Sequence, residues 1–217
     1  MSPSDRRNVA VAARTETRPS TSTTKTPPMS VKIVIAGGFG VGKTTMVGTL
    51  SDIPPLTTEA AMTTASIGVD DTSQVSSKTT TTVAMDFGRI AIDEDMVLFL
   101  FGTPGQDRFG FMWDDLIVGA LGAVVLVDLR RIDDCFPAID YFESRNIPFV
   151  VAINRFEGSD SPDVSEVREA LDLDTEHPIV LCDARYKESV KGAVLSLIEL
   201  LMSKSRRRQS DSRRLLS

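Results

Sequence analysis

One short segment restricts what this chain can fold into more than any other: residues 37–45 read G-G-F-G-V-G-K-T-T. The segment contains the pattern G-x-x-x-x-G-K-[ST], in which glycines let several backbone N–H groups point toward a chain of phosphates. The apolar run V-K-I-V-I-A precedes it at 31–36, and a helical pattern follows it until Pro54. Because the pattern requires a buried strand before the loop and a helix after it, we predict a phosphate-binding loop at residues 37–45.

The side chains of this loop have separate expected roles. Lys43 is expected to reach the terminal phosphates of a nucleotide, and the Thr44 hydroxyl is expected to ligate Mg²⁺. Phe39 is a large aromatic residue among small ones, and two orientations are open for it: toward the terminal phosphate, where it would obstruct the site, or away from it. The predicted phosphate-binding residues of the loop are Gly37, Gly38, Phe39, Gly40, Val41, Gly42, Lys43, Thr44 and Thr45.

Apolar runs that alternate with helical patterns indicate an α/β fold. We predict strands at 31–36, 82–92, 96–101, 122–128, 148–154 and 178–183, and helices near 44–51, 108–119, 134–145, 164–171 and 188–203. Most of these strands are apolar throughout, as strands covered by helices on both faces must be. The short turn after residue 92 requires an antiparallel pair. The sequence therefore predicts a three-layer α/β sandwich, of the P-loop type, around a six-stranded, mostly parallel sheet with one antiparallel edge strand.

Composition divides the chain into a globular body and two polar ends. The net charge is −6 over 217 residues, but both ends are basic, so the body carries the acidic excess. Residues 1–29 are rich in Ser, Thr, Pro and Arg and cannot bury enough apolar surface to become ordered. We therefore expect a disordered tail at 1–29, one nucleotide-binding domain at 30–203 and a basic disordered tail at 204–217.

The same composition argues against several classes of function. An acidic body is a poor general binder of nucleic acid. No apolar run is long enough to cross a bilayer, and no signal peptide or lipidation motif is visible. Two separated cysteines and a single histidine offer neither a disulfide framework nor a histidine-based metal site. We therefore expect a cytoplasmic protein with at most peripheral membrane association.

A second motif, G-T-P-G-Q-D-R-F at 102–109, follows the strand at 96–101. It resembles the D-x-x-G-Q segment of the Ras-like small GTPases, whose fold is the P-loop sandwich predicted above. The resemblance implies that the N–H of Gly105 meets the γ-phosphate and that Gln106 orients the attacking water. Gln106 and Lys43 are therefore the candidate catalytic residues.

The metal site implied by this resemblance lacks one group. Gly102 stands where the Ras-like family has an aspartate that helps to hold Mg²⁺. A glycine cannot do this, so metal binding must rely on Thr44, phosphates and water, or on another carboxylate such as Asp86. The family also places a switch threonine before its second strand, and T-T-T-T at 79–82 occupies that place. Thr80 is the predicted metal ligand, with the two flanking threonines as alternatives.

Two further segments stand where the family recognises the base. V-A-I-N-R-F-E at 151–157 replaces N-K-x-D, and C-D-A-R at 182–185 replaces S-A-K. The resemblance implies that Asn154 holds the loop and contacts the base, that the Arg155 stem stacks over it, and that Glu157 accepts two hydrogen bonds from guanine. Guanine is preferred because adenine has no paired donors for that carboxylate. The predicted base-binding residues are Asn154, Arg155, Glu157, Ala184 and Arg185.

Within the Ras-like family, this sequence most resembles the small GTP-binding proteins of actinobacterial signalling cassettes called conservons. It is also similar to the polarity GTPases of bacterial gliding motility. The segments that carry the resemblance are G-G-F-G-V-G-K-T-T, T-T-V-A-M-D-F-G, F-G-T-P-G-Q-D-R-F and N-R-F-E. The resemblance implies small roadblock (LC7-type) partners and, for conservons, a sensor-kinase-like membrane protein.

These motifs predict a regulatory GTPase that binds GTP with Mg²⁺ and slowly hydrolyses it to GDP and phosphate as a molecular switch. A nucleotide-bound scaffold with little or no turnover is one alternative, which Gly102 and Phe39 favour. A P-loop ATPase is another, and it leaves N-R-F-E and the Gln106 motif without explanation. An arginine in cis could assist hydrolysis, and Arg89 and Arg108 are the candidates.

Overall fold

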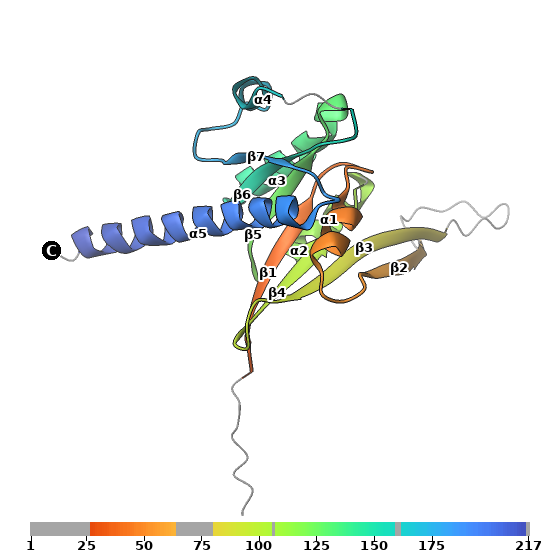
Figure 1. The fold of residues 1–217 in the computed structure, drawn as a ribbon, viewed down its shortest axis with the longest axis horizontal. Coiled ribbons are helices and arrows are strands. Elements are labelled where there is room, and N and C mark those ends of the chain that lie inside the picture. Colours follow the sequence, from red (N-terminus) through yellow and green to blue (C-terminus); the bar gives the residue numbers. More distant parts are fainter. Residues whose placement is uncertain (1–26, 64–79, 106, 159–161, 216–217) are drawn as a thin grey trace, which may run out of the picture.

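A central sheet with helices on both faces makes up the part of the chain that the computed structural model describes, residues 27–63, 80–105, 107–158 and 162–215 (Figure 1). Chain order alternates strands and helices, as the sequence predicts. The elements are β1 (Met29–Ala36), α1 (Lys43–Leu50), β2 (Leu56–Thr63), β3 (Thr80–Ala91), β4 (Met96–Gly102), the 3-10 helix η1 (Asp107–Met112), α2 (Trp113–Ile117), β5 (Ala120–Val127), the 3-10 helix η2 (Leu129–Cys135), α3 (Phe136–Ser144), β6 (Phe149–Asn154), α4 (Val164–Ala170), β7 (Ile179–Cys182) and α5 (Lys187–Leu215).

The sheet has seven strands in the order β2-β3-β4-β1-β5-β6-β7. The five strands from β4 to β7 in this order are parallel to their neighbours. The pairs β2–β3 and β3–β4 are antiparallel. The prediction of a mostly parallel sheet with an antiparallel edge is thus confirmed, and the strand count is one higher than predicted.

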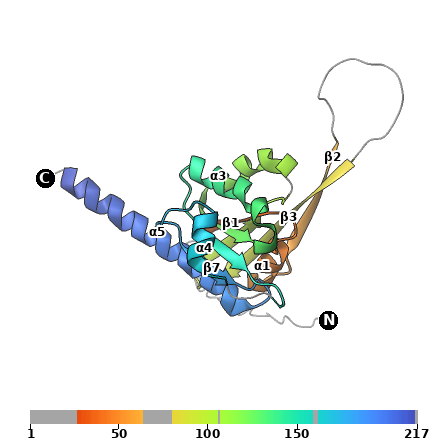
Figure 2. The ribbon, with the colours of Figure 1, turned by 90° about the horizontal axis from the view of Figure 1, so that it is seen from above.

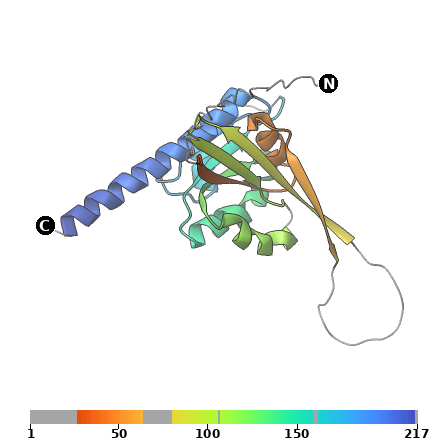
Figure 3. The same cartoon turned by 90° about the horizontal axis from the view of Figure 1, so that it is seen from below.

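Side chains of the central strands alternate between two cores. Ile33 and Ile35 of β1 pack with α1 and α5, whereas Val34 and Ala36 pack with the face that carries α2, α3 and α4. Both sets of side chains are fully buried. Figures 2 and 3 view the resulting three layers from opposite sides, with the sheet between its helices. A strand segment buried on both faces must be apolar at every position, which explains the continuous apolar run at 33–36 after the half-buried Lys32.

The additional strand, β2, lies within residues 53–78, a Thr/Ser-rich segment with little periodicity for which the sequence predicts a long surface loop. Leu56–Thr63 pairs with β3 in register from Leu56–Phe87 to Thr63–Thr80. The segment L-T-T-E-A-A-M-T lacks the apolar alternation of a half-buried strand, so its pattern resembles a loop. Threonine nevertheless favours extended backbone, and pairing with β3 satisfies the backbone groups of this edge strand. In Figures 1–3 the β2–β3 hairpin extends away from the body on the side opposite to the end of α5. The rest of the predicted loop, 64–78, lies outside the described residues.

The last helix is longer than predicted. α5 continues to Leu215, so the expectation of a disordered tail from residue 204 is wrong for residues 204–215. The segment S-K-S-R-R-R-Q-S-D-S-R-R has no apolar stripe to indicate burial, but it also contains no glycine or proline that would end a helix. Within the described residues, no helix combines the length and apolarity needed to cross a membrane. The predicted tail at 1–29 lies almost wholly outside the described residues.

Two predicted helices begin with tighter turns. The segment predicted at 108–119 consists of η1 followed by the short helix α2, and the segment at 134–145 consists of the end of η2 followed by α3. Arg131 interrupts η2 with a non-helical backbone, at φ −145° and ψ 56°. This irregular segment runs directly beside the phosphate loop, as described below.

Candidate functional site

The predicted motifs meet at one edge of the sheet. Parallel strands end at the same edge, and the segments at 37–45, 102–105, 154–157 and 182–185 follow β1, β4, β6 and β7. β1 lies between β4 and β5 in the sheet. The strands that follow β1 in the chain are first added on its β4 side and then, from β5 onward, on its other side. Open α/β sheets bind ligands at the carboxyl ends of strands at such a position.

Close packing forces glycine at two positions of the phosphate loop. Gly37 has a φ of +133°, and a Cβ there would collide with the Leu126 carbonyl of β5. Gly42 precedes α1 with a φ of +107°, and a Cβ there would lie 2.7 Å from Asn154 Nδ2. The loop therefore lies directly against β5 and the base-recognition segment, and larger residues would push it away.

Lys43 is buried in the loop with its amine held by backbone. Its Nζ donates to the Gly37 carbonyl at 2.8 Å and to the Gly38 carbonyl at 2.7 Å, and the residue is only 7% exposed. Burial lowers the pKa of Lys43 to about 8, and the nearby Asp86 carboxylate partly opposes this shift. A polyphosphate at the loop would offer this amine stronger acceptors than the two carbonyls.

We expect nucleotide binding above pH 8 to take up a proton at Lys43. The free protein loses this proton as the pH rises through about 8, whereas phosphates beside the amine favour its charged form and raise its pKa. The affinity should therefore fall by up to about tenfold per pH unit above pH 8. Calorimetry at pH 9 in two buffers of different ionisation enthalpy measures the uptake. About one proton per nucleotide is expected, and an uptake of zero would contradict the assignment.

Thr44 lies beside a carboxylate from a different strand. Its Oγ1 donates to Asp86 Oδ2 of β3 at 2.7 Å. Thr80, the predicted second metal ligand, begins β3, and a strand rises about 3.4 Å per residue, so Thr80 lies roughly 20 Å along β3 from Asp86. The structure thus brings Thr44 and Asp86 together and keeps Thr80 apart from them. A metal role for Thr80 would require the hairpin to shorten.

The second motif packs against the phosphate loop. A Cβ on Gly105 would lie 2.5 Å from Lys43 Nζ and 2.9 Å from Phe39 Cα, so the two motifs are in direct contact. This contact places the Gly105 backbone at the end of the loop where the resemblance expects the γ-phosphate. Gln106 itself lies outside the described residues, and its catalytic role stays a prediction.

Phe39 is exposed, and an arginine that the sequence did not reveal holds its backbone. The Phe39 residue is 64% exposed, and this exposure is compatible with both orientations of its ring. The Arg131 Nη2 donates to the Phe39 carbonyl at 2.6 Å, and the Arg131 Nη1 lies 3.4 Å from Asp134 Oδ2. No motif marks Arg131, because only the fold brings η2 against the loop. Arg131 therefore holds the phosphate loop at the Phe39 carbonyl from η2.

Arg89 and Arg108 are the two arginines that the sequence offers to assist hydrolysis in cis, and neither is seen in contact with the phosphate loop in the part of the chain that the structure describes. The Arg89 N–H donates to Ser51 Oγ at 3.1 Å. Ser51 follows the carboxyl end of α1, whereas the phosphate loop precedes its amino end. Arg89 is therefore distant from the loop. The Arg108 side chain is outside what the structure describes.

Asn154 joins three segments of the site. Its Nδ2 donates to the Val41 carbonyl of the phosphate loop at 2.8 Å, and its Oδ1 accepts from the Ala184 N–H at 3.0 Å. Thr49 of α1 donates to the Ala184 carbonyl at 2.7 Å, which fixes the same segment again. The Ala184 N–H that the resemblance assigns to the base is thus used by Asn154 here. Asn154 holds the loop geometry as predicted.

The remaining predicted base contacts lie at the surface. Arg155 and Glu157 are exposed, and Arg155 N–H donates to the Cys182 carbonyl at 2.7 Å. Arg185 forms a bidentate pair with Asp183, at 2.9 and 2.8 Å, which holds the pKa of Asp183 below its usual value. Glu157 is close enough to Arg185 to raise the pKa of that guanidinium further. The structure gathers these charged groups at one end of the site, and their contacts with a base stay a prediction.

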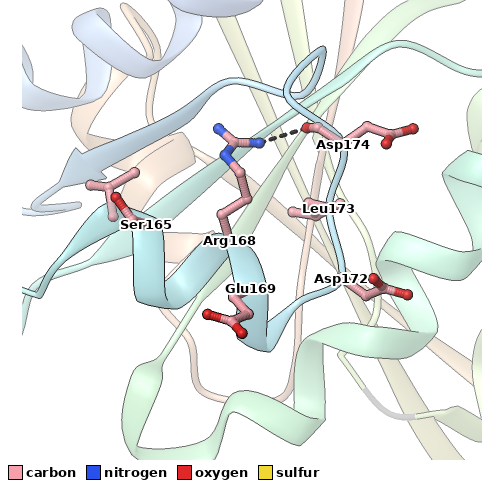
Figure 4. Close-up of a pocket in the computed structure, with 7 residues that line it drawn as sticks. Ser165, Arg168, Glu169, Asp172, Leu173 and Asp174 are labelled. Carbon is pink, nitrogen blue, oxygen red and sulfur yellow. Dashed lines mark hydrogen bonds between the residues drawn. The ribbon is translucent and has the colours of Figure 1, made fainter.

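A separate hollow beside α4 does not contribute to this site. Val164, Ser165, Arg168, Glu169, Asp172, Leu173 and Asp174 line it. Figure 4 shows Arg168 donating to the Asp174 carbonyl, at 2.6 Å, which ties α4 to the loop that follows it. None of the residues of the four motifs contributes to the hollow, so we assign it no part in nucleotide binding.

Similar proteins share both the sequence and the fold. The ATP_bind_1 family, described as conserved hypothetical ATP-binding proteins, matches residues 35–204. An uncharacterised protein of Methanocaldococcus jannaschii is 33% identical over 139 residues, which cover 63% of this chain and 77% of that protein. The range matched by the family model, residues 35–204, includes all four motifs.

Solved structures with a similar fold include domains of FeoB proteins. The cytosolic domain of the T. maritima FeoB iron transporter in a GDP form has a TM-score of 0.57 at 16% identity, covering 81% of this chain and 65% of that one. The FeoB G-domain of Methanococcus jannaschii has a TM-score of 0.52 at 14% identity, covering 80% and 98%. This chain thus spans slightly less than two thirds of the T. maritima chain. The fold is that of a P-loop nucleotide-binding protein, and the chain belongs to the ATP_bind_1 family of conserved hypothetical ATP-binding proteins.

Proposed function

We propose that this protein is a regulatory GTPase that binds GTP with Mg²⁺, hydrolyses it slowly, and acts as a switch in a bacterial signalling cassette. The observation that best supports the proposal is the Asn154 amide, which connects the phosphate loop to the base-recognition segment at 2.8 and 3.0 Å. That connection joins the phosphate and base ends of one continuous site. Glu157 follows in the same loop and offers a carboxylate to the paired donors of guanine.

The residues of this chain supply binding and orientation to the reaction. Backbone N–H groups of 37–44 and the Lys43 amine hold the phosphates. Gln106 orients the water that attacks the γ-phosphorus in line, so that the bond to the β,γ-bridging oxygen breaks and GDP leaves. Mg²⁺, when bound, neutralises charge that develops on the phosphates. Thr44 Oγ1 and Asp86 Oδ2, 2.7 Å apart, are two hard oxygen donors that suit this cation.

Slow turnover is expected from Phe39. Phe39 is exposed, and its Cα lies beside Gly105, which directly precedes Gln106 in the chain. A bulky group there restricts the approach of Gln106, or of an arginine from a partner, to the γ-phosphate. Phe39→Gly should therefore raise the single-turnover rate of GTP hydrolysis, by up to about tenfold. Gln106→Ala should lower it. A rate equal to that of wild type would remove the substituted residue from the mechanism, and no measurable hydrolysis by wild type would leave the nucleotide-bound scaffold as the function.

A P-loop ATPase is the second candidate, and the description of the family as ATP-binding favours it. The two candidates differ in the base that the segment 154–157 recognises. Adenine would leave the Glu157 carboxylate without paired donors, which is why guanine is our proposal. A competition titration between GTP and ATP separates them.

The cellular setting follows from resemblance alone. We propose a cytoplasmic protein that associates with a small roadblock (LC7-type) protein and with a sensor-kinase-like membrane protein. The basic end of α5 supports peripheral association with an acidic surface, because Lys204, Arg206, Arg207 and Arg208 lie exposed or half-buried along it.

A further inference from the structure

The carboxylate missing from the second motif has a substitute on the adjacent strand. β3 and β4 pair in register so that Asp86 lies directly opposite Gly102. Asp86 is only 6% exposed, and its Oδ2 lies 2.7 Å from Thr44 Oγ1. The carboxylate therefore reaches the hydroxyl of the phosphate loop from β3, although β4 lacks an acidic side chain at this position.

The packing shows that positions 86 and 102 share one space. A Cβ on Gly102 would lie 3.0 Å from Asp86 Cβ and 3.1 Å from Asp86 Oδ2. Contacts this short force a neighbour to move, and a full aspartate at 102 would need still more room. A side chain at 102 would therefore require the Asp86 side chain to move by at least a few tenths of an ångström. Glycine at 102 leaves the room that Asp86 occupies in this arrangement.

The surroundings of Asp86 suit a divalent cation that is shared with phosphate. Thr44 donates to the carboxylate, and its oxygen keeps lone pairs for a metal. Lys43 interacts electrostatically with the same carboxylate, which offsets part of the cost of burying the charge. Among the described residues, no group of three or more His, Cys, Asp or Glu side chains could hold a metal alone. Mg²⁺ is typically bound in this way, by one or two protein oxygens together with phosphates and water.

We propose that Asp86 is the carboxylate that serves the Mg²⁺ of the nucleotide complex, moved from β4 to β3, and that it sets the Mg²⁺ dependence of nucleotide affinity. This inference rests on the proposed function only in requiring that a nucleotide binds at residues 37–45. It holds for GTP or ATP alike, because the metal contacts phosphates and not the base.

The test compares nucleotide release with and without chelator. The full chain is loaded with fluorescent N-methylanthraniloyl-GDP, or with the ADP analogue if the protein prefers adenine. The rate of nucleotide release is then measured in millimolar Mg²⁺ and, separately, in an excess of EDTA. In the wild type, EDTA should accelerate release by about 10- to 100-fold. Asp86→Asn keeps the shape and an acceptor for Thr44 but removes the charge, so its release should already be fast in Mg²⁺ and change little with EDTA. Asp93→Asn, at the exposed β3–β4 turn, is the matched control and should behave as wild type.

An exchange variant makes the test specific to the position of the charge. Asp86→Gly combined with Gly102→Asp returns the carboxylate to β4 and removes the side chain that would collide with it, so the response to EDTA should return. Titration of Mn²⁺ into each GDP complex, followed by electron paramagnetic resonance, should show the same order of metal affinities without any hydrolysis. Melting curves identify a variant that does not fold, and Asp86→Asn remains decisive if the exchange variant fails.

The outcomes separate the two proposals. If wild type binds nucleotide and Asp86→Asn retains the full response to EDTA and the same Mn²⁺ affinity, the role of Asp86 is refuted and the proposed function stands. If wild type binds neither guanine nor adenine nucleotide, both proposals fail. If EDTA no longer accelerates nucleotide release in Asp86→Asn, but does so in wild type, in Asp93→Asn and in the exchange variant, the result supports both the role of Asp86 and nucleotide binding at residues 37–45.

Discussion

Replacement of Lys43 by alanine is expected to lower the affinity for GTP and GDP by at least about 100-fold, a loss of roughly 3 kcal/mol. The Lys43 amine is buried and held 2.8 and 2.7 Å from the carbonyls of Gly37 and Gly38, so it is already positioned inside the loop that we propose binds the phosphates. Alanine would remove the positive charge and leave two loop carbonyls without their donor. The affinity is measured by the fluorescence of a labelled nucleotide.

Lys191→Ala is the matched control for this change. Lys191 lies on α5, 46% exposed and paired with Glu188 at 2.7 Å, so its loss removes one positive charge from the protein without touching the site. The control should bind nucleotide as wild type does. Retained affinity in Lys43→Ala would show that residues 37–45 are not the phosphate site.

The second large effect is expected at Asn154, both on stability and on binding. Asn154→Ala removes the donor to the Val41 carbonyl and the acceptor for the Ala184 N–H, and leaves these buried backbone groups unpaired. Each such group costs about 1–3 kcal/mol, so the free energy of unfolding should fall by roughly 2–6 kcal/mol. Nucleotide affinity should fall as well, by at least about tenfold, because the phosphate loop and the base segment lose their connection.

Asn154→Asp tests the need for a donor toward the Val41 carbonyl. The carboxylate keeps the acceptor for the Ala184 N–H but brings a buried negative charge against the Val41 carbonyl, so in urea unfolding at neutral pH the variant should be at least as destabilised as the alanine variant. An alanine variant as stable as wild type, with unchanged affinity, would contradict the connecting role of Asn154.

Most of the fold is predictable because its sheet is buried on both faces. Continuous apolar runs such as 31–36 and 148–154 have few alternatives to a central strand, and the glycine loop after the first run sets the helix that follows. β2 and the end of α5 were missed for the opposite reason. Both are polar segments whose structure comes from backbone pairing or from helix propensity, and neither carries an apolar periodicity.

The site is predictable only where a motif is continuous in sequence. The loop at 37–45 and Asn154 were found from local patterns, and the structure brings them together as expected. The contact between Thr44 and Asp86 depends on the register of β3 against β4, and that of Arg131 with Phe39 depends on an irregular turn of η2. Thr80 was predicted as a metal ligand from its spacing in the sequence. That spacing does not reveal that Thr80 begins β3, at the end of the strand far from Asp86 and the phosphate loop. Such positions follow from tertiary packing and not from spacing.

The most direct test of the central claim is a competition titration with purified protein, Mg²⁺ and a labelled guanine nucleotide. Unlabelled GTP should displace the label at a concentration at least about tenfold lower than ATP, because only guanine offers paired donors to the carboxylate of the segment 154–157. Glu157→Ala should reduce this preference. Equal displacement by the two nucleotides, or tighter binding of ATP, would contradict the assignment of this chain as a GTP-binding switch.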